Sequence, residues 1–308
     1  MIPKLAGPLA ILTASLVTAP AFATQSLYHT RLNAPAGGTL TLSTDVGSVS
    51  VVGGATSHVT FQLKAEGPRS NTTSFHIVAR TTPEGVRISV QRHSRFFHGW
   101  FNWLHWFGRS HDHVQLSAAV PSAYRLDLRA AGGSIRVRNL NASVQASSSG
   151  GGANLQNITG AVDVHTAGGD IKARNIQGAT RLSSSGGDVI ISDSSGSLTL
   201  HAAGGDISIH NANGRVRASS SGGDIRAEMT AVHRISLHTA GGDITLLLPQ
   251  NTHAAVKAEA VGGSVDCDFP LSTTQMSGNG ALDGTIGGGG PQISLHSAGG
   301  DIHIAAQQ

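Results

Sequence analysis

The sequence predicts an all-β protein: a parallel β-solenoid (β-helix) of 18-residue half-repeats, preceded by an irregular β-rich N-terminal cap with an aromatic insert. Three features predict it: a fixed period, alternation of apolar and polar residues, and Gly/Asn corners. Gly-Gly pairs begin 18 residues apart, at Gly132, Gly150, Gly168, Gly186, Gly204 and Gly222. Such a period is typical of stacked units that bury their apolar faces against their neighbours.

Each repeat contains two short segments in which apolar residues alternate with other residues. In one repeat these are Ile207 and Ile209 in the first segment and Val216 and Ala218 in the second. A period of two predicts strands with one buried face. Between the segments lie an Asn or Asp and then a glycine, which tolerate the backbone conformations of tight corners.

The residues before the Gly-Gly pairs add a second period. Serine stands at positions 147, 183 and 219, and histidine at 165, 201 and 238. If one coil takes 18 residues, Ser and His alternate along one edge; if it takes 36, His stacks on His. We expect the 36-residue coil, because stacking of like on like would explain the alternation. The pattern does not predict handedness or oligomeric state.

Residues 1–23 have the features of a signal peptide: Lys4, an apolar run from Leu5 to Val17, and the small-x-small site Ala21–Ala23. Loss of Lys4 lowers the formal net charge from +3 to +2, too little for a dedicated nucleic-acid binder. No later stretch is apolar enough to cross a bilayer. We therefore expect an exported protein, periplasmic or at the cell surface.

The mature chain divides into two regions. Residues 24–123 form the predicted cap, which includes a degenerate first coil over Gly38–Val52, and residues 124–308 carry the solenoid repeats. Solenoids need atypical terminal units to close their open ends.

Six aspartates follow glycine pairs: Asp170, Asp188, Asp206, Asp224, Asp243 and Asp301. We interpret them as structural turn residues, because an Asp at a corner can accept hydrogen bonds from the amides of its own turn. The alternative is a cation site or a cluster of carboxylates that cleaves polysaccharide.

Four histidines precede the same corner motif: His165, His201, His238 and His296. If they stack, they could capture a transition metal, since imidazole suits zinc, copper and nickel. The alternative, which we favour, is a surface ladder of rings without metal. No cofactor is expected.

The segment 93–113 has seven of the 13 aromatic residues of the chain: Phe96, Phe97, Trp100, Phe101, Trp103, Trp106 and Phe107. This density exceeds what a thin coil needs. The loop either contacts an envelope surface, a protein or a glycan, or folds back to plug the solenoid.

Three closing blocks, Asp268–Leu271, Leu282–Pro291 and Ile293–Ile302, resemble the end of the bacterial putative-adhesin family of unknown function, whose members have serial Ser/Ala-Gly-Asp-Ile/Val repeats. The resemblance implies a β-solenoid of envelope or extracellular location and carries over no catalytic residue. Gly-Gly corners and the aromatic insert depart from the family pattern.

Together these observations predict a non-enzymatic structural or binding protein of the cell envelope with an unidentified ligand. Two alternatives remain: a polysaccharide-acting β-helix enzyme using the stacked Asp residues, and a periplasmic metal-binding protein using the His row.

Overall fold

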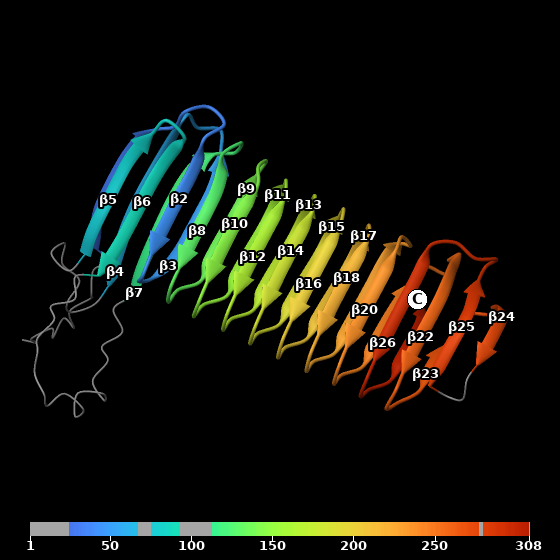
Figure 1. The fold of residues 1–308 in the computed structure, drawn as a ribbon. Helices are drawn as coiled ribbons and strands as arrows, with labels where there is room; N and C mark the ends of the chain where they lie inside the picture. Colours follow the sequence, from blue (N-terminus) through green and yellow to red (C-terminus); the bar gives the residue numbers. More distant parts are fainter. Residues whose placement is uncertain (1–24, 67–74, 93–112, 277–279, 308) are drawn as a thin grey trace, which may run out of the picture.

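The computed structural model describes residues 25–66, 75–92, 113–276 and 280–307, and all regular secondary structure in these ranges is β-strand. The chain winds into an elongated stack of coils whose strands form two long sheets (Figure 1). The prediction of an all-β, parallel solenoid is confirmed. Across these ranges, the structure has no helix that is long and apolar enough to cross a membrane.

The first sheet, sheet A, has 13 strands in the described part of the chain. Their spatial order is β1 (Gln25–Asn33), β4 (His58–Glu66), β7 (His113–Pro121), β3 (Ser48–Gly54), β9 (Ile135–Leu140), β11 (Ala153–Thr159), β13 (Ile171–Gln177), β15 (Val189–Ser195), β17 (Ile207–Asn213), β19 (Ile225–Ala231), β21 (Ile244–Leu248), β27 (Ile302–Ala306) and β23 (Val265–Cys267).

The second sheet, sheet B, has 14 strands in the same described ranges. Their spatial order is β24 (Leu271–Met276), β25 (Ala281–Ile286), β22 (Ala254–Ala260), β26 (Gln292–Ser297), β20 (Ile235–Thr239), β18 (Val216–Ser220), β16 (Leu198–Ala202), β14 (Thr180–Ser184), β12 (Val162–Thr166), β10 (Val144–Ser148), β8 (Arg125–Ala130), β2 (Thr39–Thr44), β6 (Gly85–Arg92) and β5 (Phe75–Thr82).

One coil takes 18 residues, so the expected 36-residue coil is wrong. Val144 pairs with Val162 in the parallel ladder of sheet B, and Ala153 pairs with Ile171 in sheet A. An 18-residue unit already contains one strand for each sheet and the two reversals that join them. The alternating Ser and His side chains lie on the outside of the coil, where packing does not require a residue to stack on another of the same type.

Aliphatic side chains from both sheets fill the space between them. In one coil Ile207, Ile209, Val216 and Ala218 are all buried, and the residues between them in the strands face outward. The parallel register sets Ile207 beside the equivalent Ile225 of the next coil. Burying one such large aliphatic side chain contributes roughly 1.5–3 kcal/mol.

Asparagines with positive φ angles lie within three inner strands of sheet A, near the C-terminal ends of β9, β11 and β13. Asn139, Asn157 and Asn175 adopt positive φ angles of 59°, 56° and 53°, which Asn tolerates better than most residues. Each side-chain amide bonds to the one below: Nδ2 of Asn157 to Oδ1 of Asn139 at 2.9 Å, and Nδ2 of Asn175 to Oδ1 of Asn157 at 3.0 Å. These strand residues therefore also join successive coils.

Both ends of the stack depart from sequence order. The coil of β2 and β3 lies between the coil of β6 and β7 and that of β8 and β9, and the coil of β26 and β27 lies between β20 and β21 on one side and β22 and β23 on the other. Figure 1 shows this as a blue strand between cyan and green ones, and a red strand beside β20. The predicted first coil over Gly38–Val52 therefore exists, but it lies inside the stack.

Antiparallel strands close the two ends. β1 pairs with β4, β4 with β7 and β5 with β6 at the N-terminal end, and β24 and β25 pair beside β22 at the C-terminal end. Because each end is folded back in this way, the last parallel coil does not present its whole apolar interior to solvent.

Candidate functional site

The six predicted turn aspartates form a single row along the stack. The carboxylate of each Asp accepts a hydrogen bond from the backbone N–H of the Asp one coil further on. The donor and acceptor pairs are Asp188 to Asp170 (3.1 Å), Asp206 to Asp188 (2.9 Å), Asp224 to Asp206 (2.8 Å), Asp243 to Asp224 (2.8 Å) and Asp301 to Asp243 (2.8 Å). The carboxylates thus join coil to coil.

The row ends at Asp301, where Ser264 supplies two donors. The backbone N–H of Ser264 lies 2.7 Å from Oδ1 of Asp301 and its hydroxyl 3.0 Å. These bonds favour the charged form and hold the pKa of Asp301 below its ordinary value. The row presents one carboxylate per coil, whereas acid and base catalysis of glycoside hydrolysis needs two carboxylates across one cleft.

A row of buried hydroxyls forms hydrogen bonds with backbone groups of the same Gly-Gly corners. The hydroxyl of Ser220 donates to the carbonyl of Gly205 at 3.0 Å and accepts from the N–H of Gly223 at 3.0 Å. Ser184 makes the same pair of bonds two coils earlier, and Ala202 stands at the equivalent place in the coil between them.

The four predicted histidines do not come together. His165 and His201 both pair with Ser183, one on each side, so they lie two strands, or roughly 9.5 Å, apart. His201 Nδ1 lies 3.0 Å from the hydroxyl of Ser219. No single ion could bind all four imidazoles of the row.

Two members of the row are nevertheless neighbours, because β26 lies beside β20. The rings of His238 and His296 stack with centroids 4.9 Å apart and an interplanar angle of 3°. Glu259 follows on β22, with its carboxylate 3.7 Å from Nδ1 of His296. Of the predicted ladder of rings, only this pair is stacked, because Ser183 and Ser219 separate the other histidines of the row.

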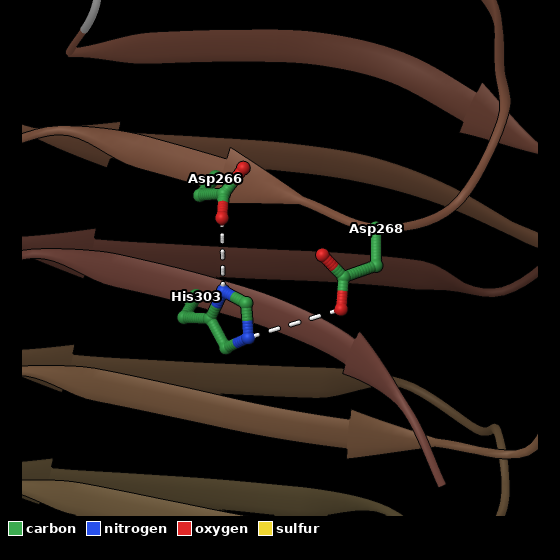
Figure 2. Close-up of side chains that lie close together, drawn as sticks. All are labelled: Asp266, Asp268 and His303. Carbon is green, nitrogen blue, oxygen red and sulfur yellow. Dashed lines mark ion pairs between the residues drawn. The ribbon is translucent and has the colours of Figure 1, made fainter. Parts of the chain in front are cut away.

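A different cluster lies on the outer face of sheet A near the C-terminal end (Figure 2). His303 of β27 pairs across the ladder with Asp266 of β23, and Asp268 follows two residues later. His303 Nδ1 lies 3.3 Å from a carboxylate oxygen of Asp266, and Nε2 lies 3.9 Å from one of Asp268. One ligand atom from each residue can be chosen so that all lie within 4.8 Å of one another.

Sequence reasoning missed this cluster. The Asp-x-Asp spacing at 266 and 268 was a usable signal, because alternate residues of a strand share a face. Cys267 between them lies on the other face and is half-buried; burial raises the pKa of its thiol. Only the insertion of the last coil beside β23 brings His303 to these carboxylates.

The N-terminal half of sheet A carries a basic outer face. Arg136 and Arg138 project from β9, and Lys172 and Arg174 from β13, with all four side chains exposed. Hereafter these four residues are the basic face. A hollow of about 600 Å³ adjoins it, lined in part by Lys64, Arg136 and Lys172.

The predicted aromatic contact residues, Phe96 to Phe107, lie outside the described residues. The described strands that flank the segment are β6, which ends at Arg92, and β7, which begins at His113. The backbone N–H of Arg92 donates to both carboxylate oxygens of Asp45, at 3.0 and 3.1 Å. Both attachment points therefore belong to the N-terminal end of the stack.

The fold and these surfaces define a long two-sheet β-solenoid protein whose corners are tied by side-chain rows. The family model Toastrack DUF4097 matches residues 39–305, so the chain belongs to this family. That match agrees with the resemblance drawn from the closing blocks, and the repeat motifs quoted for it stay a prediction.

Two solved structures are similar to the chain. A "putative cell adhesion protein" from Clostridium sporogenes is 10% identical over 91% of this chain and 99% of its own, with a TM-score of 0.24. A "putative adhesin" from Bacteroides fragilis is 14% identical over 91% of this chain and 96% of its own, with a TM-score of 0.37. No curated protein matches the chain.

Proposed function

We propose that the protein is an exported, non-enzymatic β-solenoid that acts as a rigid scaffold and binding protein of the cell envelope. The observation that carries this proposal is the row of aspartates, since each carboxylate of this row accepts a hydrogen bond that holds the neighbouring coil in register. A stack tied at every corner resists bending and keeps its outer side chains at a fixed spacing, which suits a structure that spans a distance and presents a surface.

The aromatic loop is the proposed contact with the envelope partner, protein or glycan. Its flanking strands are anchored at one end of the stack, so a partner held there would leave the rest of the solenoid free to project. Aromatic side chains with Arg and His beside them suit an interface that is partly apolar and partly wet.

Sedimentation with isolated envelope fractions tests this proposal on the mature chain. Replacing Trp100, Trp103 and Trp106 together by Ser is expected to abolish co-sedimentation and to leave the melting temperature nearly unchanged. The matched control replaces three exposed valines elsewhere, Val52, Val78 and Val261, by Ser and should sediment as the unaltered protein does. A large fall in melting temperature for the Trp variant would contradict the contact role and identify the loop as a plug.

We infer a second candidate function, binding of a divalent transition metal, from the cluster of Asp266, Asp268 and His303. Two carboxylates and an imidazole are a donor set that zinc accepts at bond lengths of about 2.0–2.2 Å. Ligand atoms of one such ion lie roughly 3.3–3.5 Å apart, so small side-chain rotations from the observed distances would suffice. All three groups are solvent-accessible, so a hydrated ion could reach them directly.

Calorimetric titration with zinc, nickel and manganese salts tests the metal site. The unaltered chain should bind one ion, and His303→Ala should weaken that binding by about tenfold or more. His201→Ala, from the predicted row, is the matched control and should bind normally. Equal binding by the His303 variant would refute the site, and loss in a His296→Ala variant alone would move it to the stacked pair.

A further inference from the structure

The basic face forms a regular grid with the strand between its two cationic strands. The parallel register places Asn154 of β11 between Arg136 and Lys172, and Gln156 between Arg138 and Arg174. Neighbouring strands lie about 4.8 Å apart, and alternate residues of a strand about 6.7 Å. Four cationic groups and two amides therefore emerge from an area of backbone of roughly 10 by 7 Å.

The cations of this grid are largely unpaired. Within the described ranges, no carboxylate lies at ion-pair distance from Arg136, Arg138 or Arg174, and Lys172 has only a contact of 4.0 Å with Asp170. Four like charges at such spacing repel one another, and an anion spanning them would relieve that repulsion. The whole chain has a formal net charge of only +3, so this grid is a local concentration of charge.

Two hollows continue the grid along the sheet. The larger, of about 600 Å³, reaches from Lys64 of β4 past Arg136 to Lys172, and its lining also offers the hydroxyls of Ser48 and Ser134. The smaller, of about 240 Å³, includes Gln156, Lys172, Arg174 and Ser192. Lys172 belongs to both, so the two hollows form one track across several strands.

We propose that this track binds an acidic polysaccharide. Arginine pairs with carboxylate or sulfate groups through two parallel hydrogen bonds, whereas lysine attracts them as a point charge. The amides and hydroxyls between the cations match the hydroxyl groups of sugar rings. Two strands, β9 and β13, carry the cations on either side of the uncharged β11, which suits a polymer that crosses the strands with its charges about two strand spacings apart.

A nucleic acid fits the same track less well. Single-stranded nucleic acids are held by aromatic side chains that stack on bases, and neither hollow has an aromatic residue in its described lining. The proposal rests on the proposed function, since an exported binding protein meets envelope and extracellular glycans. The basic face shares no residue with the aromatic loop, so the two proposed contacts can be tested separately.

Sheet B supplies the internal contrast. Its outer face mixes charges: Asp127 forms an ion pair with Arg129 at 3.3 Å, and Asp163 pairs directly with Arg181 across the ladder. Arg181, Arg215, Arg217 and Arg234 are exposed on that side of the stack. They provide a control set with the same number of removable charges.

The experiment measures binding of the mature chain to sodium polygalacturonate and heparin, with neutral dextran as a negative probe. The unaltered protein should bind at least one acidic polymer, with binding lost at about 0.5 M salt because screening shortens the range of these interactions. Arg136→Gln, Arg138→Gln, Lys172→Gln and Arg174→Gln together should weaken it by about tenfold or more. The control quadruple, with Gln at 181, 215, 217 and 234, should bind within about twofold of the unaltered chain.

Circular dichroism should show that both variants keep the fold, since all eight side chains are exposed. Failure of the unaltered chain to bind either acidic polymer, or equal loss in both variants, would overturn the proposal. Tighter binding to single-stranded DNA or to phosphatidylglycerol vesicles than to both polysaccharides would overturn it as well. Envelope sedimentation of the unaltered chain separates the two proposals: if the chain sediments with the envelope but binds neither acidic polymer, only the polysaccharide site is wrong.

Discussion

Replacing Gly205 by alanine tests directly whether successive corners abut. A Cβ at this position would lie 2.5 Å from the carbonyl oxygen of Gly187 and 2.6 Å from Oδ1 of Asp188, both in the coil below. The preceding residue, Gly204, provides the matched control, because its Cβ would meet nothing closer than 3.5 Å. The second glycine of each pair is therefore required by the close approach of the preceding coil.

The expected cost follows from these distances. Contacts below 3.0 Å with backbone atoms need a shift of the corner itself, and overpacking of this kind costs about 1–3 kcal/mol. The shift would also stretch the hydrogen bond from the N–H of Asp206 to Asp188, now 2.9 Å, worth about 1 kcal/mol. We expect Gly205→Ala to lower the free energy of unfolding by about 2–4 kcal/mol, whereas Gly204→Ala should change it by less than about 1 kcal/mol.

Urea unfolding followed by circular dichroism measures the difference, with thermal melts as a second probe. The Gly205 variant should unfold at a lower urea concentration, and its melting temperature should fall by roughly 4–8 °C. Equal stability of the two alanine variants would refute the reasoning, because it would mean that the corners do not touch as the structure has them.

Three further predictions concern the corner rows. Ser220→Ala should lower stability by about 1–2 kcal/mol, because it leaves two partly buried backbone groups without their partner. Ala202→Ser should raise stability by up to about 1 kcal/mol. A urea titration that ranks these two variants otherwise would exclude the bridging role. Asn175→Ala should cost about 1–2 kcal/mol in the same assay and Asn175→Gly less, because only alanine resists the positive φ; the reverse order would count against the backbone explanation. Because the pKa of Asp301 is lowered in the fold, its contribution is present above the unfolded pKa near 3.9 and is lost as pH falls through the folded value. Melting temperatures should therefore drop below about pH 4, less steeply in Ser264→Ala, and identical pH profiles would show that the Ser264 bonds do not matter.

The repeat architecture could be predicted because its causes are local. Alternation at Ile207 and Ile209 shows the buried face of a strand, and the Asn and Gly corners need conformations that few other residues accept. The same strands and corners recur once per period along the stack, so a single repeat already contains most of the information about the fold.

The coil length was not predictable from the pattern that we used. Ser183 and His201 lie on the outer surface, where an alternation of residue types costs no packing energy, so their period says nothing about the winding. The buried positions, such as Val162 and Thr180, repeat every 18 residues. The period of the buried residues therefore sets the length of one coil.

By itself the sequence determined that the chain is a stack of β-coils with an apolar interior, because alternation and corner residues act within a few residues of one another. Only the tertiary structure decided which distant segments are neighbours. The last coil inserts beside β21 and β23, and this alone sets His296 against His238 and His303 against Asp266. The physical reason is that any coil of this stack offers nearly the same edge to the next, so the order of coils at the ends depends on how the whole molecule closes.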